Sequence, residues 1–311
     1  MPLQGNVTKA MRNRTSVRDQ WRDARPPLNL GMFSLSSARP VAVVTGASAG
    51  LGLTICKALL DDGHDVVGVG RDNSRLQTAA AWLNSLTRPG EATAKGRFTA
   101  IAADVSDPDA VSGLFTEIGT TLGRIDLLVN CVGQSDRGTA ASLSRERLIE
   151  LIDANVTTAL LCSQAALPLL KVSRGVVVNI GSLASKVGAR HLGGYPAAKH
   201  ALAGLTQQMR LEWREYGVHV ALISPGPIRR DDQGQRYHSH AHDASLPASA
   251  MQPGGGTSIR GIEATVVANQ VLRCARRRAP DVMVPGYARL LVAVGHLCPR
   301  LGDWLLLRMT K

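Results

Sequence analysis

Short apolar runs alternate with longer segments of helical periodicity between residues 40 and 285. In the first such segment Leu51, Ile55 and Leu59 recur four residues apart, which is the spacing of one helix face. The apolar runs predict seven strands, at residues 41–45, 66–69, 98–102, 127–130, 176–180, 219–224 and 282–284. The periodic segments predict helices at residues 50–62, 74–86, 110–122, 145–170, 196–216 and 262–278.

Strands that alternate with helices in this way predict an α/β fold. Consecutive parallel strands need crossover connections, and helical crossovers cover both faces of the sheet. Because such crossovers are right-handed, the expected architecture is a doubly wound parallel sheet of seven strands. No break interrupts the pattern, so residues 40–285 are expected to form a single domain.

Three segments lie outside the alternation. Residues 1–39 are polar and aperiodic, which predicts a disordered basic leader; a start at Met32 and a transit peptide are the alternatives. Residues 227–257 follow a strand end and are poor in apolar side chains, as is typical of a substrate lid. Residues 286–311 hold two apolar stretches around Pro299 and predict an amphipathic helical extension. This extension either lies in a membrane interface or packs on the domain or on a dimer partner.

The net charge of +12 lies mainly at the two ends of the chain. Residues 1–39 carry +5 and residues 256–311 carry +6, whereas residues 40–255 carry only +1. A nearly neutral body with 4% aromatic residues argues against a nucleic-acid-binding protein. Basic ends beside apolar stretches favour either contact with an anionic membrane surface or simply solvated tails.

Five scattered cysteines, without a CxxC pair or a Cys/His cluster, indicate a reducing compartment and predict no metal site. No run of about 18 apolar residues occurs, so no transmembrane helix is predicted. We therefore expect a cytoplasmic protein, with peripheral membrane contact through residues 287–311 as an open alternative.

The segment TGASAGLG, residues 45–52, joins the first strand to the first helix. Gly46 permits a tight turn, Gly50 lets backbone N–H groups approach a phosphate, and Gly52 permits close packing of helix on strand. The N-terminus of the helix then faces the phosphate, so the segment predicts a dinucleotide site.

Residues at the ends of the next three strands are further candidates for this site. Gly70 occupies the place where an acidic residue would bind a free ribose 2′-hydroxyl, and the guanidinium of Arg71 suits a 2′-phosphate. NADP is therefore expected rather than NAD, with an exposed loop arginine as the alternative. Asp104 either accepts from an adenine amino group or lies beside a helix cap. Asn130 either braces the central strands or borders the cofactor, and Gly133 permits close backbone approach.

A serine, a tyrosine and a lysine supply candidate acid–base chemistry. Ser182 ends the fifth strand, and Tyr195 and Lys199 follow in YPAAK, four residues apart on one helix face. A free phenol has a pKa of about 10, and a neighbouring ammonium lowers it by favouring the phenolate. Because Ser182 shares the sheet edge with the glycine-rich turn, these side chains are expected to lie beside the cofactor. An unrelated surface pair is the alternative.

Taken together, these motifs resemble the short-chain dehydrogenase/reductase family over residues 40–285. The resemblance is carried by TGASAGLG, NCVG, the asparagine of DANV, the serine of NIGS, YPAAK and the PG at 225–226, in family order and at similar spacing. It implies a Rossmann fold and an NAD(P)-dependent oxidoreductase of ketones and secondary alcohols. The basic, apolar C-terminus is similar to those of 3-ketodihydrosphingosine reductases and hydroxysteroid dehydrogenases, which implies a lipophilic substrate.

The resemblance also implies roles for individual residues. Tyr195 is implied as the general acid in carbonyl reduction and the base in the reverse direction. Lys199 lowers its pKa and binds the nicotinamide ribose, Ser182 orients the substrate carbonyl, and Asn155 anchors a water that relays protons to Lys199. The implied cofactor contacts are Thr45, Gly46, Ser48, Gly50, Leu51, Gly52, Arg71, Asp104, Val105, Asn130, Gly133, Tyr195, Lys199, Pro225, Gly226 and Ile228.

Two positions depart from the family pattern. NCVG replaces the usual NNAG, and Arg230 stands where a threonine is common, so no hydroxyl role is carried to that position. Family analogy also implies a homo-oligomer. The alternative to an enzyme is a catalytically silent nucleotide-binding or scaffold protein, which usually lacks the tyrosine or the lysine.

Overall fold

The computed structural model describes residues 39–86, 96–229 and 246–310. The predicted disordered leader therefore lies outside the described residues except at its last position, and so does Arg230. All of the described residues belong to one compact unit.

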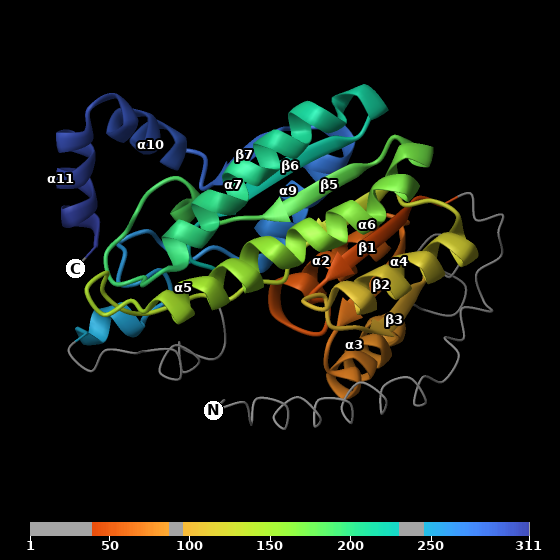
Figure 1. Ribbon diagram of the computed structural model, residues 1–311. Coiled ribbons are helices and arrows are strands. Elements are labelled where there is room, and N and C mark those ends of the chain that lie inside the picture. The colour runs from red at the N-terminus through yellow and green to blue at the C-terminus, as the bar shows by residue number, and fades with distance from the viewer. Residues whose placement is uncertain (1–38, 87–95, 230–245, 311) are drawn as a thin grey trace, which may run out of the picture. The chain divides into compact units, whose positions relative to one another are not determined.

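A seven-stranded parallel sheet forms the centre of this unit, in the order β3-β2-β1-β4-β5-β6-β7 (Figure 1). All six neighbouring pairs are parallel, and all seven strands match the predicted apolar runs. The strands are β1 (Val41–Thr45), β2 (Asp65–Gly70), β3 (Phe98–Ala102), β4 (Leu127–Asn130), β5 (Val176–Ile180), β6 (His219–Pro225) and β7 (Asp281–Val284). The order reverses between β1 and β4, which is where doubly wound sheets bind ligands.

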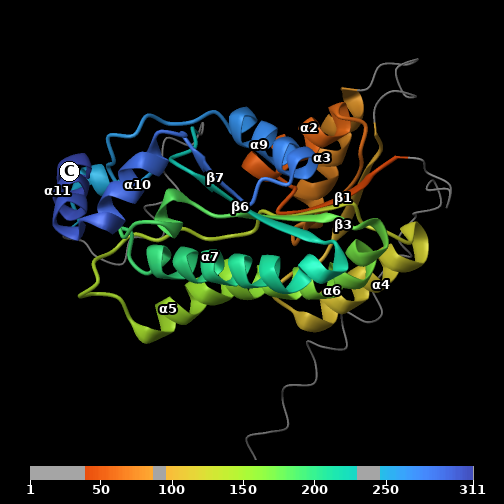
Figure 2. The same ribbon diagram turned by 90° about the horizontal axis from the view of Figure 1, so that it is seen from above.

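Helices cover both faces of the sheet, as the alternating pattern predicts (Figure 2). One face carries α2 (Gly50–Asp61), α3 (Asn73–Ser85) and α9 (Ala264–Arg277). The other face carries α4 (Pro108–Leu122), α5 (Arg145–Ile152), α6 (Thr158–Ser173) and α7 (Tyr195–Glu212). After β7 the chain forms α10 (Ala288–Leu297) and α11 (Pro299–Met309), which confirms two helices in the extension.

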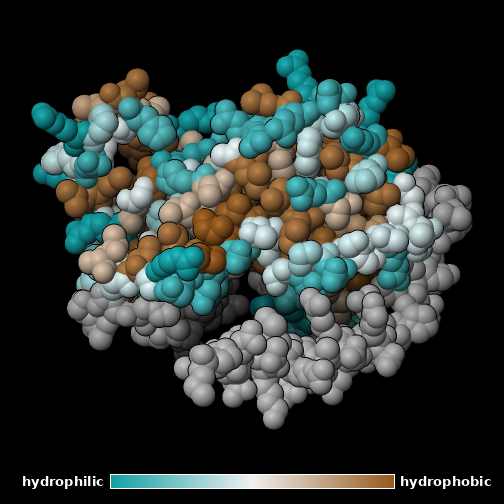
Figure 3. All heavy atoms as spheres, viewed as in Figure 1, coloured by the Kyte–Doolittle hydropathy of each residue, from teal (hydrophilic) through white to brown (hydrophobic). Residues whose placement is uncertain are grey.

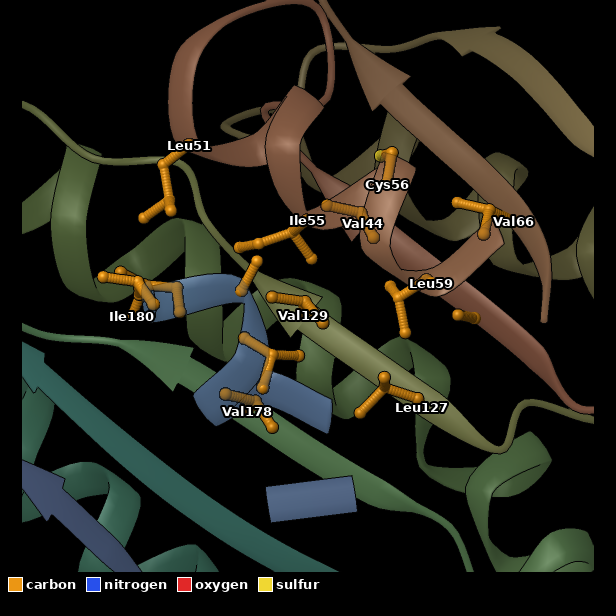
Figure 4. Packing of buried hydrophobic residues seen from close by; sticks show 14 of the residues in the cluster. Val44, Leu51, Ile55, Cys56, Leu59, Val66, Leu127, Val129, Val178 and Ile180 are labelled. Atoms are coloured by element: carbon orange, nitrogen blue, oxygen red, sulfur yellow. The ribbon is translucent and has the colours of Figure 1, made fainter. Parts of the chain in front are cut away.

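A hydrophobic core cluster fills the layer between the sheet and α2 and α9 (Figure 4). Ile55 and Leu59 of α2 are fully buried there against Val44, Val129 and Val178 of the strands. Burial of each such side chain stabilises the fold by about 2 kcal/mol. The regular spacing of these residues on α2 therefore fixes the orientation of the glycine-rich turn at the N-terminus of this helix.

The helix predicted at 145–170 is interrupted by a π-helical turn at Asp153–Thr157. The whole stretch Arg145–Ser173 is long and apolar enough to cross a membrane by length and composition alone. It packs instead within the domain, because α6 contacts β4, β5 and α4. The turn carries the buried Asn155, so the interruption positions a side chain that the resemblance assigns to the active site.

Candidate active site

The carboxyl ends of β1, β4, β5 and β6 border a cleft of about 440 Å³. The glycine-rich turn lines one end of it, Ser182, Tyr195 and Lys199 line the middle, and α10 and α11 line the other end. The structure thus brings the predicted catalytic residues together beside the predicted cofactor turn.

The glycine-rich turn has the shape of a phosphate cradle. Gly46 and Gly50 have φ angles of +71° and +55°, a region that favours glycine. A Cβ at Gly52 would lie 2.1 Å from the carbonyl oxygen of Gly46, so only glycine lets α2 approach the turn this closely. Gly46, Gly50, Leu51 and Gly52 all line the cleft. These residues fit the pyrophosphate of a dinucleotide at the N-terminus of α2.

Two arginines follow the end of β2, the strand that pairs with β1. Arg71 is exposed directly after β2, but Arg75, in the first turn of α3, is the one that lines the cleft. The Asp72 carboxylate accepts a hydrogen bond of 3.0 Å from the Arg75 backbone N–H, so Asp72 caps α3. Sequence reasoning missed Arg75, although an arginine three residues after a helix cap was a usable signal.

Thr45 and Asn130 face inward and hold the strand ends together. The Asn130 amide donates to Asn179 Oδ1 at 2.8 Å and to Ser163 Oγ at 2.9 Å. The Thr45 hydroxyl accepts from the Cys131 N–H at 3.1 Å. Both side chains are buried and neither lines the cleft, which favours the bracing role for Asn130 and gives Thr45 a similar one, while their contact with the cofactor stays a prediction. They brace the sheet edge on which the cofactor turn stands.

Asp104, Val105 and Ser48 also lie outside the lining of the cleft. Asp104 Oδ1 accepts from the backbone N–H of Ser106 at 3.0 Å and from its hydroxyl at 2.7 Å. Val105 is buried, and Asp107 is the residue that caps α4. Of the two interpretations of Asp104, this geometry favours the position beside a helix cap.

Asn155 is fixed in place by the loop after β4. Its amide nitrogen donates to the carbonyl oxygens of Gln134 and Leu151, both at 2.9 Å, and its Oδ1 accepts from the Gln134 N–H at 3.2 Å. A Cβ at Gly133 would lie 2.7 Å from Asn155 Oδ1 and 3.3 Å from Lys199 Nζ. The asparagine oxygen and the lysine ammonium therefore converge on Gly133, where only a glycine leaves room for both.

Lys199 is buried beneath Tyr195. Its Nζ donates to the Ile180 carbonyl oxygen at 3.0 Å and lies 5.8 Å from the centroid of the Tyr195 ring. Burial lowers the pKa of the Lys199 ammonium to about 8, because the charged form loses its hydration. Ser182, at the end of β5, is partly exposed, and its hydroxyl accepts from the Ala184 N–H at 3.1 Å.

A buried aspartate, paired with a partly buried arginine, fixes the start of α7. Asp136 Oδ2 accepts from the Gly194 N–H at 3.1 Å, and its Oδ1 lies 3.1 Å from the Arg147 guanidinium. A Cβ at Gly193 would lie 2.1 Å from Asp136 Oδ2, the oxygen that accepts from Gly194. Because Tyr195 is the first residue of α7, Asp136 positions the phenol. Sequence reasoning did not single out Asp136, since an isolated aspartate carries no motif.

The last part of the cleft is apolar. Pro225, Gly226 and Ile228, which the resemblance assigns to cofactor contacts, line the cleft here. Of the predicted lid at 227–257, residues 230–245 lie outside the described part, and Gly254 and Thr257 line the cleft. The inner faces of α10 and α11 complete it with Ala288, Leu291, Val292, Gly295, Gly302, Leu305, Leu306, Met309 and Thr310. One face of the extension thus packs on its own domain. Packing on the domain was one of the alternatives that the sequence left open.

This arrangement can polarise and protonate an oxygen atom beside a hydride donor. The hydroxyls of Ser182 and Tyr195 border the same cleft, and the Lys199 ammonium lies behind the phenol. Within the described residues, no group of three or more His, Cys, Asp or Glu side chains gathers to hold a metal. The residues present therefore suit acid–base chemistry with a nicotinamide cofactor.

Comparison with known proteins gives consistent results. A sequence model of the short chain dehydrogenase family matches residues 40–240. A 3beta-hydroxysteroid dehydrogenase of Mediterraneibacter gnavus is 32% identical over 202 residues, which cover 64% of this chain and 70% of that protein. A gluconate 5-dehydrogenase of Gluconobacter oxydans is 35% identical over 196 residues, 63% and 73% of the two chains. The crystal structure of a metagenomic short-chain oxidoreductase in complex with NADP aligns with a TM-score of 0.60 and 26% identity, covering 79% and 95%.

Proposed function

Because the chain belongs to the short chain dehydrogenase family and is an oxidoreductase that acts on CH–OH groups with NAD(P), we propose that it interconverts a lipophilic ketone and its secondary alcohol with NADP(H). The observation that carries this proposal is the convergence of Asn155, Ser182, Tyr195 and Lys199 beside the glycine-rich turn.

In the direction of reduction, Tyr195 donates its hydroxyl proton to the substrate carbonyl oxygen, which the Ser182 hydroxyl holds by a hydrogen bond. NADP(H), when bound, supplies the hydride that the carbonyl carbon gains. The Lys199 ammonium stabilises the phenolate that remains. Asn155 holds the water through which Lys199 and then Tyr195 regain a proton. In oxidation the same groups act in reverse, with Tyr195 as the base.

The preference for NADP rests on the cations at the end of β2. Gly46, Gly50 and Gly52 would hold the pyrophosphate, while Arg75 at the cleft and the nearby Arg71 would pair with the 2′-phosphate. No acidic side chain competes at Gly70, where a free 2′-hydroxyl would need one. The structurally similar metagenomic enzyme was crystallised with NADP.

The preference for a lipophilic substrate rests on the apolar wall that α10 and α11 build. Leu291, Leu305, Leu306 and Met309 offer no hydrogen-bonding group to a polar substrate, so desolvating a sugar or an acid here would be costly. A relative with 32% identity is named for a hydroxysteroid substrate. We further propose that the protein acts in the cytoplasm as a homo-oligomer, with peripheral membrane contact through residues 287–311.

The test is NADPH oxidation with a panel of ketones, by wild type and by Tyr195→Phe. Loss of the proton donor should lower kcat/KM about a hundredfold or more, without weakening NADPH binding measured by fluorescence. Equal rates in the two proteins would reject Tyr195 as the acid. Tight NADPH binding by the wild type with no turnover of any ketone would favour the silent nucleotide-binding protein instead.

A further inference from the structure

Exposed apolar side chains concentrate on the C-terminal hairpin, which we define as α10, Cys298 and α11. Twelve large hydrophobic residues are exposed in the described part of the chain, and six of them lie between residues 287 and 307. They are Tyr287, Leu290, Leu297, Leu301, Trp304 and Leu307. The exposed fractions are 69% for Leu290, 87% for Leu297 and 58% for Leu307. Such a gathering over about twenty residues marks an interaction surface rather than ordinary surface variation.

Each helix of the hairpin is apolar on two opposite faces. On α10, Leu291 and Val292 line the cleft, while Leu290 and Leu297 face away from it. On α11, Leu305 and Leu306 line the cleft, while Leu301, Trp304 and Leu307 are exposed. A helix that is apolar on both sides is normally buried on both sides. The cleft accounts for the inner face and leaves the outer face without a described partner.

The hairpin is held so that its outer face stays outward. The Ser258 N–H donates to the Met309 carbonyl oxygen at 2.8 Å, which ties the end of α11 to the loop below it. His296 Nε2 lies 3.3 Å from the Lys186 carbonyl oxygen, and the Arg289 guanidinium donates to the Asp281 carbonyl oxygen at 2.7 Å. Two of these bonds tie α10 to the domain and one ties the end of α11, and together they favour the observed orientation of the hairpin.

The charge of the outer face is positive. Arg289, Arg300 and Arg308 are exposed on the hairpin, and Asp303 is the acidic residue among its described positions. The Arg308 guanidinium lies 4.2 Å from the centroid of the Trp304 ring. Figure 3 shows hydrophilic and apolar residues side by side on this part of the surface. Arginine and tryptophan beside leucine are typical of a helix that lies in the plane of a membrane interface.

We propose that the outer face of the C-terminal hairpin docks on an anionic lipid surface. The ten residues of α10 and the eleven of α11 are too few to span a bilayer, so the helices lie in the interface. A second copy of the chain fits less well, because a symmetric contact would oppose two surfaces of the same positive sign. The surface stands independently of the chemistry at Tyr195. If the proposed function also holds, the cleft directly behind the hairpin receives its substrate from the bilayer.

The test is co-sedimentation of the full chain with vesicles of phosphatidylcholine alone or of phosphatidylcholine with phosphatidylserine. Wild type should bind the anionic vesicles, bind the neutral ones far more weakly, and release as salt rises. Each arginine near an anionic surface strengthens binding about fivefold, so Arg300→Gln with Arg308→Gln should weaken it about thirtyfold. Leu297→Glu with Trp304→Glu should abolish it. Val172→Glu, at an apolar position that is 69% exposed and lies far from the hairpin in sequence, should bind like wild type.

The basic residues 1–39 are identical in all four proteins, so binding through them would leave the variants unchanged and overturn the proposal. Absence of binding by wild type would overturn it as well. Light scattering adds a further check: if the Leu297/Trp304 variant loses a subunit contact that wild type makes without lipid, the face joins two copies and the lipid proposal is wrong. Thermal unfolding of each variant verifies that the hairpin changes leave the domain folded.

Discussion

At the scale of single residues, burial of the charged Lys199 side chain is costly and also serves the proposed chemistry. Its ammonium is buried and has the Ile180 carbonyl oxygen as its described hydrogen-bond acceptor, and this burial lowers its pKa from 10.5 to about 8. A carboxylate partner would hold the lysine charged, but it would also neutralise the cation that the phenol needs. The structure instead lowers the pKa of Lys199 toward neutral pH by burial, so the ammonium is still charged at pH 7 but gives up its proton more readily.

This shift predicts how stability depends on pH. The unfolded chain keeps the Lys199 proton up to pH 10.5, whereas the folded apoprotein loses it near pH 8. Between these values the unfolded state binds more protons, so the free energy of unfolding should rise with pH. Replacing Lys199 by Met removes the effect. The stability of Lys199→Met relative to wild type should therefore be about 2.5 kcal/mol more favourable at pH 7 than at pH 10.

Urea unfolding of both apoproteins at the two pH values measures this difference. Lys57→Met, at an exposed helix position, is the matched control and should show little change between the two pH values. A difference for Lys199→Met that is no larger than the one for Lys57→Met would mean that the buried ammonium is not destabilised in the folded protein.

At the scale of elements, the C-terminal hairpin depends on one close contact. α10 and α11 cross at Gly295 and Gly302, where a Cβ added to Gly302 would lie 2.6 Å from Gly295 Cα. Both glycines line the cleft. Because the neighbour is backbone, the contact cannot relax by a side-chain rotation, and any larger residue must separate the helices. The shape of the apolar wall is thus set by this crossing.

Gly302→Ala should consequently loosen the hairpin at a cost of about 1–3 kcal/mol, the usual range for overpacking. We expect faster amide exchange over residues 288–310 and a several-fold higher KM for a long apolar ketone. For a small ketone, which does not reach the hairpin, kcat/KM should stay near the wild-type value. Gly286→Ala, which has no neighbour within 4 Å, is the control. Equal effects on the long and the short ketone would show that the hairpin does not form the substrate wall.

At the scale of the whole molecule, the fold was predictable because its elements are locally encoded. The seven apolar runs each became a strand, since parallel strands buried on both faces are continuously apolar. Gly46, Gly50, Ser182, Tyr195 and Lys199 were found because each belongs to a motif at a fixed distance from a strand end. They meet in the cleft because those strand ends share one edge of the sheet.

Other parts of the site depend on contacts that no local pattern encodes. Asn130 and Thr45 turn inward and brace the sheet, and the sequence alone did not give the direction of these side chains. Asp136 positions α7 from a loop 58 residues before Gly194, and no motif links the two. The two helices of the hairpin were predicted from two apolar stretches. Their position against the cleft depends on packing between parts of the chain that are distant in sequence.

The central claim is that this cleft passes a hydride from a reduced nicotinamide to a ketone carbon while Tyr195 protonates the oxygen. The most direct measurement follows the label from NADPH deuterated at the transferable C4 position into the product of a long apolar ketone, by mass spectrometry. We predict one deuterium on the carbinol carbon of the alcohol formed by wild type, and little alcohol from Tyr195→Phe at saturating cofactor. An alcohol formed without the label, or labelled equally fast by Tyr195→Phe, would contradict this account.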